Sequence, residues 1–350
     1  MYLIGAYLQI CLQIYIFQLF LTLNLYFLGF FCSCIAPIYL YFSKRKMSGE
    51  VIYKNFFAMG TRLDMVLPDI PDDVATDFSM EAKNELIKME NKISIYKDDS
   101  VFSALNKLAF ASPQVVEQGM FALIRDLKTI SAKTFGYFDF TIGKLADWMR
   151  IYTNQGVAES AYDQLLSETG EHNVILNTAS SAVSFATDKV YIDSGGFGKG
   201  LALDLLVKVM NTWMIPSAFV SFGESSILAH GKHPFGHTWK TGVRHLFKEN
   251  DSAYTFNMRD EVLSVSGITP ENIKKYGRGH VLNPKSGVPV NTYKQAAVVG
   301  PAGLISEALS TALLCAPEEA CVDIMNGFKD YRAVIIDYDE EKNPNIVFTY

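Results

Sequence analysis

The chain has 350 residues, of which 49% are hydrophobic and 19% charged, and it carries a formal net charge of −6 at pH 7. This length allows one large domain or two small ones. The negative charge, with no basic cluster outside residues 44–46, argues against a nucleic-acid-binding surface. The five cysteines do not form a disulfide framework, and we expect Cys315 and Cys321 to be small buried hydrophobic residues.

The N-terminal segment is apolar. Residues 1–43 contain no charged side chain, and Lys44-Arg-Lys46 follows directly. Residues 10–40 are long enough to cross a bilayer, since about 20 apolar residues suffice. Basic residues immediately after such a stretch favour a cytoplasmic position for the chain on its C-terminal side. We therefore expect a membrane anchor in an N-terminal segment, residues 1–46, ahead of a folded domain, residues 47–350.

Two other interpretations of this segment stay open. In one, Cys32 or Cys34 is the acylated residue of a lipoprotein signal, which also predicts membrane association. In the other, Met47 is the true start, so residues 1–46 are a spurious extension and the protein is cytoplasmic. The side of the membrane is not determined by the sequence.

The first part of the folded domain is predicted to be mainly helical. Apolar residues recur at helical spacing in several windows, and Ser100 is a candidate N-cap. The expected elements are a strand at 51–67, a turn at 68–71, helices at 72–93, 101–107 and 117–133, a helix ending at Trp148, and a polar linker at 153–170.

The second part is predicted to be mainly β-structure. The expected strands are 172–177, 182–186, 189–193, 218–222, 226–229, 239–243, 254–258, 262–265, 295–300, 332–338 and 346–350, with helices at 201–210, 304–315 and 317–327. Helices gather early and strands late, without a regular βαβ alternation. This order predicts an α+β fold.

A glycine-rich loop, Asp193-Ser-Gly-Gly-Phe-Gly-Lys-Gly200, lies between an apolar run and a helix-like run. Glycines let backbone N–H groups approach a phosphate, and a helix N-terminus favours an anion. The order of residues in this loop matches neither the P-loop motif nor the dinucleotide-binding motif. The loop therefore predicts a phosphate-bearing ligand, with an ordinary tight turn as the alternative.

Motifs in the same order along residues 51–350 resemble the FAD:protein FMN transferase (ApbE) family. They are Met59-Gly-Thr61, Tyr96-x-x-x-Ser100, Phe138-Asp-Phe-Thr141, the glycine-rich loop, Ser266-Gly267, His280-Val-Leu-Asn-Pro284-Lys-Ser-Gly287-Val-Pro289 and Glu307-Ala-Leu-Ser-Thr311. The resemblance implies an α+β, T-fold-like domain with mixed or antiparallel sheets and flanking helices.

The resemblance also implies a reaction. The family binds FAD with a divalent cation, usually Mg²⁺, breaks the pyrophosphate and transfers FMN to a threonine of a partner protein, releasing AMP. The acceptor motif, roughly Asp-[Gly/Ser]-Ala-Thr-[Ser/Thr], does not occur in this chain. The expected partner is therefore another protein, typically a subunit of a membrane redox complex.

A metal site is predicted on the last of these motifs. Glu307, Ser310 and Thr311 share one helix face, and their oxygen atoms suit a hard cation. A solvated helix start is the alternative. The family has Asp where this chain has Glu307, and the family's remaining contact, a backbone carbonyl, falls on Gly196.

Further site residues follow from the resemblance. His280 is implied as the general base that deprotonates the acceptor threonine, since a histidine pKa near neutrality suits that task; a strand-end histidine bonded to the backbone is the alternative. Asn283 replaces the family's usual Asp, and Gly223-Glu224 replaces its usual Gly-Gly pair. The implied FAD contacts are Met59, Tyr96, Tyr137, Phe138, Asp139, Asp193, Lys199 and His280.

Two competing functions stay open. The same site could hydrolyse FAD to FMN and AMP, or the chain could be a membrane-tethered flavin-binding protein without turnover.

Three histidines, His230, His233 and His237, have a spacing compatible with a zinc site. Gly231, Pro234 and Gly236 break any helix there, so we expect a loop of solvated histidines.

Overall fold

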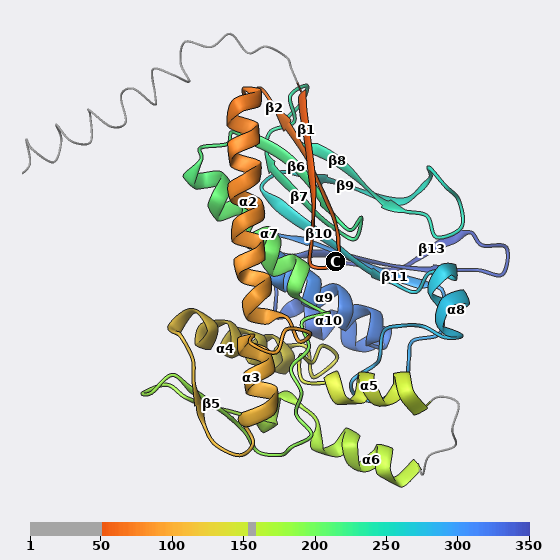
Figure 1. The fold of residues 1–350 in the computed structure, drawn as a ribbon. Coiled ribbons are helices and arrows are strands. Elements are labelled where there is room, and N and C mark those ends of the chain that lie inside the picture. The colour runs from red at the N-terminus through yellow and green to blue at the C-terminus, as the bar shows by residue number, and fades with distance from the viewer. Residues whose placement is uncertain (1–50, 153–158) are drawn as a thin grey trace, which may run out of the picture. The chain divides into compact units, whose positions relative to one another are not determined.

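The computed structural model describes residues 51–152 and 159–350, which form the fold shown in Figure 1. Its centre is an eight-stranded sheet in which every neighbouring pair is antiparallel. The strand order is β1 (Val51–Ala58), β2 (Thr61–Pro68), β6 (Ser217–Phe222), β7 (Ser226–Gly231), β10 (Glu261–Gly267), β11 (Lys294–Gly300), β12 (Arg332–Tyr338) and β13 (Pro344–Thr349).

Helices α2 (Asp72–Ile93), α7 (Gly198–Thr212) and α9 (Gly303–Cys315) pack against one face of this sheet (Figure 1). Alternate residues of β2 point into this layer, so Leu63, Met65 and Leu67 are fully buried. Burial of each such side chain stabilises the fold by about 1.5–3 kcal/mol. Helix α10 (Glu318–Asn326) follows α9 and completes this side of the core.

A separate hairpin covers part of the other face of the sheet. It consists of β8 (Trp239–Arg244) and β9 (Ser252–Met258), which pair with each other. Trp239, Phe256 and Met258 pack there against Leu263 and Val299 of the sheet. The loop that ends β8 is thereby fixed next to β10 and β11.

A second layer lies below the sheet in Figure 1. It contains α3 (Val101–Leu108), α4 (Gln118–Lys133), α5 (Gly143–Tyr152), α6 (Glu159–Glu168), the 3₁₀ turn η1 (Glu171–Asn173) and a small sheet of β3 (Gln114–Val115), β5 (Ala182–Phe185) and β4 (Val174–Asn177). Ser100 caps α3 as expected, accepting a hydrogen bond from the Ser103 N–H at 2.9 Å.

The α+β class is confirmed, but the strand expected at 51–67 is a hairpin. β1 and β2 pair antiparallel through a two-residue turn, Met59-Gly60, in which both residues have positive φ, 50° and 74°. A tight hairpin turn of this kind requires two left-handed residues, and glycine meets that demand at the second position.

Two other predictions differ from the structure, and one helix was missed. Residues 159–168 of the predicted polar linker form helix α6, and the strand predicted at 189–193 is reduced to an isolated bridge between Tyr191 and Ile142. Helix α8 (Pro270–Tyr276) was not predicted, although Thr269 and Asn272 form a capping box ahead of it.

The cysteine prediction is confirmed for the described residues. Cys315 and Cys321 are free and buried, and burial raises the pKa of Cys315 to about 12 and that of Cys321 to about 11. Within residues 51–152 and 159–350, no helix is both long and apolar enough to cross a membrane. The span predicted at residues 10–40 lies outside the described residues.

Candidate functional site

A cavity of about 820 Å³ opens where the glycine-rich loop, α9, β10 and the loop after β8 converge. Eight residues predicted for the site line it: Phe138, Asp139, Asp193, Gly196, Lys199, His280, Glu307 and Thr311. These residues come from segments far apart in the sequence, so the fold brings most of the predicted site together.

Four predicted site residues are not among the described residues that line the cavity: Met59, Tyr96, Tyr137 and Ser310. Tyr96 is 82% exposed, and the Tyr137 ring lies 4.8 Å from the Lys285 ammonium. The Met59 N–H donates to the Glu90 carboxylate at 3.0 Å. The roles of these residues in binding flavin stay predictions.

The glycine-rich loop is held by a close crossing of α7 and α9. A Cβ placed on Gly200 would lie 2.1 Å from the Gly303 carbonyl oxygen, and one on Gly303 would lie 2.4 Å from the Gly200 oxygen. Only hydrogen fits at either position. The two helix N-termini therefore meet at the edge of the cavity.

Each of these helix N-termini is capped by a carboxylate from the other helix. Asp204 of α7 accepts the Gly303 and Leu304 N–H groups of α9, at 2.6 and 2.9 Å. Glu307 of α9 accepts the Gly200 N–H of α7 at 2.5 Å. Negative charge is favoured at a helix N-terminus, so the exchange stabilises both helices. Burial raises the pKa of Asp204, while these two backbone donors oppose the shift.

Glu307 also pairs with Lys199. The Lys199 ammonium lies 2.6 Å from one Glu307 oxygen, while the Gly200 N–H holds the other. Only 4% of the Glu307 side chain is exposed, against 26% of Lys199. Charge-assisted hydrogen bonds of this kind are strong when they are shielded from water. Both oxygens of the predicted metal ligand are thus engaged by the glycine-rich loop.

Three of the predicted metal ligands lie close together and offer the oxygen chemistry that Mg²⁺ favours, with Ser310 as the exception, although the Glu307 carboxylate is bound to Lys199 and Gly200 in this structure. Gly196 and Thr311 are neighbours, since a Cβ on Gly196 would lie 3.9 Å from the Thr311 hydroxyl, and Glu307 lies one helical turn from Thr311. Mg²⁺ favours oxygen ligands and commonly uses only one or two carboxylates together with substrate phosphates. No group of three or more His, Cys, Asp or Glu side chains suited to a metal occurs in the described part of the chain.

The exception is Ser310. Its hydroxyl is fully buried, donates to the Glu307 carbonyl oxygen at 2.9 Å and lies 2.8 and 3.2 Å from the hydroxyls of Ser266 and Ser264. Ser266 lies between the two helical hydroxyls, because its own oxygen is also 3.2 Å from that of Thr311. The hydroxyl of Ser310 is therefore satisfied within the protein.

His280 lies on a loop tied to α9. The Asn283 side chain donates to the Cys315 carbonyl oxygen at 2.9 Å and accepts the Lys285 N–H at 3.0 Å. An aspartate could make only the second of these bonds, which gives a physical reason for Asn at this position. Partial burial lowers the pKa of His280, and the Lys199 ammonium lowers it further. A lowered pKa favours the neutral imidazole, the form that can accept a proton.

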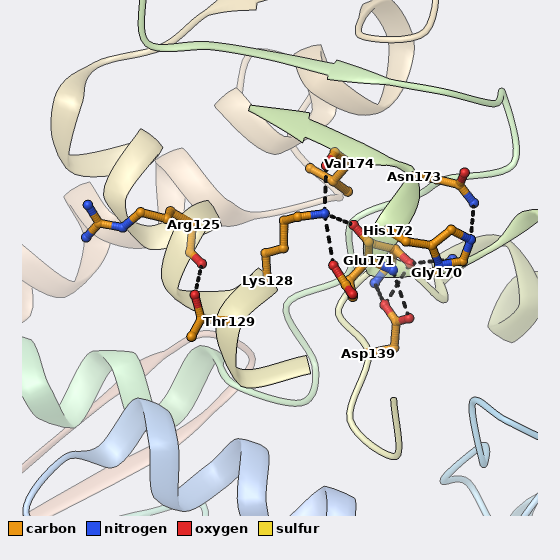
Figure 2. A network of polar contacts seen from close by, with 10 residues as sticks. Arg125, Lys128, Thr129, Asp139, Gly170, Glu171, His172, Asn173 and Val174 are labelled. Carbon is orange, nitrogen blue, oxygen red and sulfur yellow. Dashed lines mark hydrogen bonds and ion pairs between the residues drawn. The ribbon is translucent and has the colours of Figure 1, made fainter. Parts of the chain in front are cut away.

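Asp139 organises the wall of the cavity from a buried network (Figure 2). One oxygen accepts the Thr141 N–H and hydroxyl at 2.8 and 2.7 Å, and the other accepts the Glu171 N–H at 3.2 Å. Lys128 of α4 joins the network through the Glu171 carboxylate at 2.9 Å and its carbonyl oxygen at 2.7 Å. Burial raises the pKa of Asp139, and the three hydrogen bonds oppose the shift.

Several lining residues were not among the predicted site residues. Ser264, Ser266, Arg244, Glu224 and His245 all line the cavity. Arg244 and Glu224 form an ion pair at 2.9 Å. Ser266-Gly267 was identified as a motif but without a role, whereas no spacing pattern in the sequence singles out Arg244 or His245, which lie at the end of β8.

Two of the three histidines with zinc-like spacing, His230 and His233, contact other parts of the protein. His230 lies on β7, largely buried, and a ring nitrogen lies 3.0 Å from the Ile215 carbonyl oxygen. His233 packs edge-on against Trp239. The expectation of solvated histidines is therefore wrong for His230, which is bonded to the backbone.

The chain is similar in sequence to proteins of known activity. The chain is 25% identical to the FAD:protein FMN transferase of Escherichia coli K12 over 282 residues, which span 77% of this chain and 80% of that protein. It is 24% identical to the FAD:protein FMN transferase of Treponema pallidum over 271 residues, 72% of this chain and 74% of that protein.

Solved structures share the fold. The ApbE protein of Thermotoga maritima superposes with a TM-score of 0.72 at 20% identity, covering 85% of this chain and 96% of that one. The flavin transferase ApbE of Vibrio cholerae superposes with a TM-score of 0.73 at 17% identity, covering 86% and 96%. The sequence model of the ApbE family matches residues 59–335. The chain therefore belongs to the ApbE family.

Proposed function

We propose that this protein is a Mg²⁺-dependent flavin transferase that moves FMN from FAD to a threonine of a partner protein and releases AMP. The observation that carries the proposal is the convergence of Lys199, Glu307, Thr311 and His280 on one cavity, in a chain of the ApbE family. A cavity of about 820 Å³ has the size of sites that take large organic ligands.

The FAD pyrophosphate would bind at the N-terminus of α7. The Lys199 ammonium lines the cavity there and supplies positive charge, and the N-terminus of a helix favours an anion. Gly196, Thr311 and Glu307 would hold Mg²⁺, which would neutralise charge on the two phosphates as their bond breaks. Phosphoryl transfer depends mostly on such positioning and charge neutralisation, so few side chains need to react.

His280 is the proposed proton acceptor. Its neutral imidazole would accept the proton of the acceptor hydroxyl as that oxygen forms a bond to the phosphorus of the FMN half. The bond between this phosphorus and the bridging oxygen breaks, and AMP leaves with the bridging oxygen. The histidine proton then passes to solvent or product.

The acceptor is expected to be another protein, because the relatives are named FAD:protein FMN transferases and this chain lacks the acceptor motif. A subunit of a membrane redox complex is the type of acceptor that the family resemblance implies. The apolar residues 10–40 would keep the enzyme at the membrane beside such a partner. These two proposals concern where the enzyme meets its substrate and leave the chemistry unchanged.

Mass spectrometry tests the proposal directly. The purified protein, FAD and Mg²⁺ are incubated with a candidate redox subunit that carries the acceptor motif. A threonine with the mass of FMN added, together with AMP, is expected. Equal AMP release with and without the acceptor, and no adduct, would favour the hydrolase; bound FAD with no AMP at all would favour a flavin-binding protein.

A further inference from the structure

Lys199 and Glu307 form an ion pair, although the FAD pyrophosphate would need the Lys199 ammonium and Mg²⁺ would need the Glu307 carboxylate. One Glu307 oxygen lies 2.6 Å from the Lys199 ammonium, and the other accepts the Gly200 N–H. The carboxylate is thus an internal anion at the N-terminus of α7, where a phosphate would bind. The ammonium is an internal cation beside the carboxylate, where a metal would bind.

This arrangement opposes each ligand when it arrives alone. A divalent cation that approaches Glu307 meets the Lys199 ammonium, and like charges so close repel strongly in a shielded site. A pyrophosphate that approaches Lys199 and the Gly200 N–H meets the Glu307 carboxylate. When both ligands arrive together, the ammonium and amide transfer to the phosphate and the carboxylate transfers to the metal.

Resting on the proposed function, we propose that Lys199 and Glu307 form a latch that couples the binding of FAD and Mg²⁺. Lys199 acts in this as a positioning residue: in the absence of flavin it holds the carboxylate away from the metal. Because coupling between two ligands is reciprocal, FAD should tighten metal binding by the same factor as the metal tightens FAD binding.

The length of Glu307 is what makes the latch possible. The side chain starts on α9 and reaches the Gly200 N–H on α7, across the backbone contact of Gly200 with Gly303. An aspartate is one methylene shorter and cannot make both contacts from the same backbone position. Glu307→Asp therefore keeps a carboxylate for the metal but weakens its link to Lys199 and Gly200.

The test measures metal affinity rather than transfer. Mn²⁺ serves as a spectroscopic probe for Mg²⁺, and its binding is titrated by electron paramagnetic resonance with and without saturating FAD, without an acceptor. In the unaltered protein, FAD should tighten Mn²⁺ binding by about tenfold or more. Lys199→Met and Glu307→Asp should each tighten FAD-free Mn²⁺ binding about tenfold and reduce the effect of FAD.

A matched control removes a lysine with no role in the latch. Lys88 pairs with Glu85 on the surface of α2, and Lys88→Met changes the net charge as Lys199→Met does. It should leave Mn²⁺ affinity unchanged in both conditions. Comparison among variants also removes any contribution from Mn²⁺ bound to FAD in solution, which is the same for all of them.

Two results would overturn the latch. One is an equal Mn²⁺ affinity of the unaltered protein with and without FAD; the other is unchanged FAD-free affinity in Lys199→Met and Glu307→Asp, with melting curves showing both folded. If one variant does not fold, the other carries the test. If FMN is transferred but FAD does not change Mn²⁺ affinity, the latch is refuted and the proposed function stands. If FAD changes Mn²⁺ affinity but no FMN is transferred, the latch stands and the proposed function is refuted.

Discussion

Gly200 of α7 and Gly303 of α9 are in direct backbone contact, so close that a Cβ on Gly200 would lie 2.1 Å from the Gly303 carbonyl oxygen. This contact brings two helix N-termini side by side and lets Asp204 and Glu307 each cap the opposite helix. The predicted phosphate and metal ligands are therefore positioned by one helix crossing.

Gly200→Ala should destabilise the fold. The new methyl group would collide with backbone, which cannot rotate away, so we expect a loss of about 1–3 kcal/mol or more in the free energy of unfolding. Gly119→Ala is the matched control, because nothing lies within 4 Å of a Cβ at that helical position. It should be neutral or stabilising by up to about 1 kcal/mol. Urea unfolding of both variants measures the difference, and equal stabilities would contradict a tight crossing.

The pKa of His280 should lie below the ordinary histidine value of 6.5, because desolvation and Lys199 both disfavour the protonated ring. A lowered pKa leaves the ring neutral at pH 7, so transfer should lose rate only as the pH falls below about 6.5. NMR titration of the flavin-free protein measures the pKa, with the signal assigned from a His280→Gln variant. Lys199→Met should move the pKa upward; a downward movement would refute the assigned cause.

Thr311 and Ser310 should differ in their effect on metal binding, although they are adjacent in sequence. Thr311 lines the cavity, whereas the Ser310 hydroxyl is bonded within the protein. Thr311→Val should weaken Mn²⁺ binding in the presence of FAD by about tenfold, the order of one lost hydrogen bond to a charged group. Ser310→Ala should leave that affinity intact and lower stability by about 1 kcal/mol. The reverse pattern would make Ser310 the ligand.

Asn283→Asp, which restores the residue usual in the family, should destabilise this chain. The substitution removes the donor to the Cys315 carbonyl oxygen and places a negative charge near the C-terminus of α9, where the helix dipole is unfavourable to it. We expect a loss of about 1–3 kcal/mol, measured by urea unfolding. Asn177→Asp is a suitable control, because the Asn177 side chain only accepts backbone N–H groups of its own turn. An unchanged stability of Asn283→Asp would show that the bond to Cys315 contributes little.

The sequence predicted the elements with strong periodicity better than their ends. Helices 72–93 and 304–315 were placed within a residue of α2 and α9, because α2 carries an apolar stripe and α9 is a long, mostly apolar segment. Helix α7 begins at Gly198, three residues before the expected start, since glycines in the loop continue directly into its first turn. The sequence predicted a linker where helix α6 forms, because residues 159–168 are mostly polar. Its few apolar residues join a small cluster with Leu145 and Leu282.

The motifs predicted eight of the residues that line the cavity, but they did not predict the contacts among these residues. Spacing places Glu307 and Thr311 on one helix face, and this was correct. The ion pair of Glu307 with Lys199 spans 108 positions of the chain and depends on the crossing of α7 and α9. Arg244 and His245 reach the cavity only because the β8–β9 hairpin folds over the sheet, which no local pattern reveals.

Helix α9 has a further consequence for the reaction geometry. It bears Glu307 and Thr311 along its middle, and the Cys315 carbonyl oxygen at its C-terminus accepts a hydrogen bond from Asn283 on the loop of His280. Eight residues of helix span about 12 Å. If α9 shifts when ligands bind, the loop of His280 and the side chains of Glu307 and Thr311 should therefore move together with it.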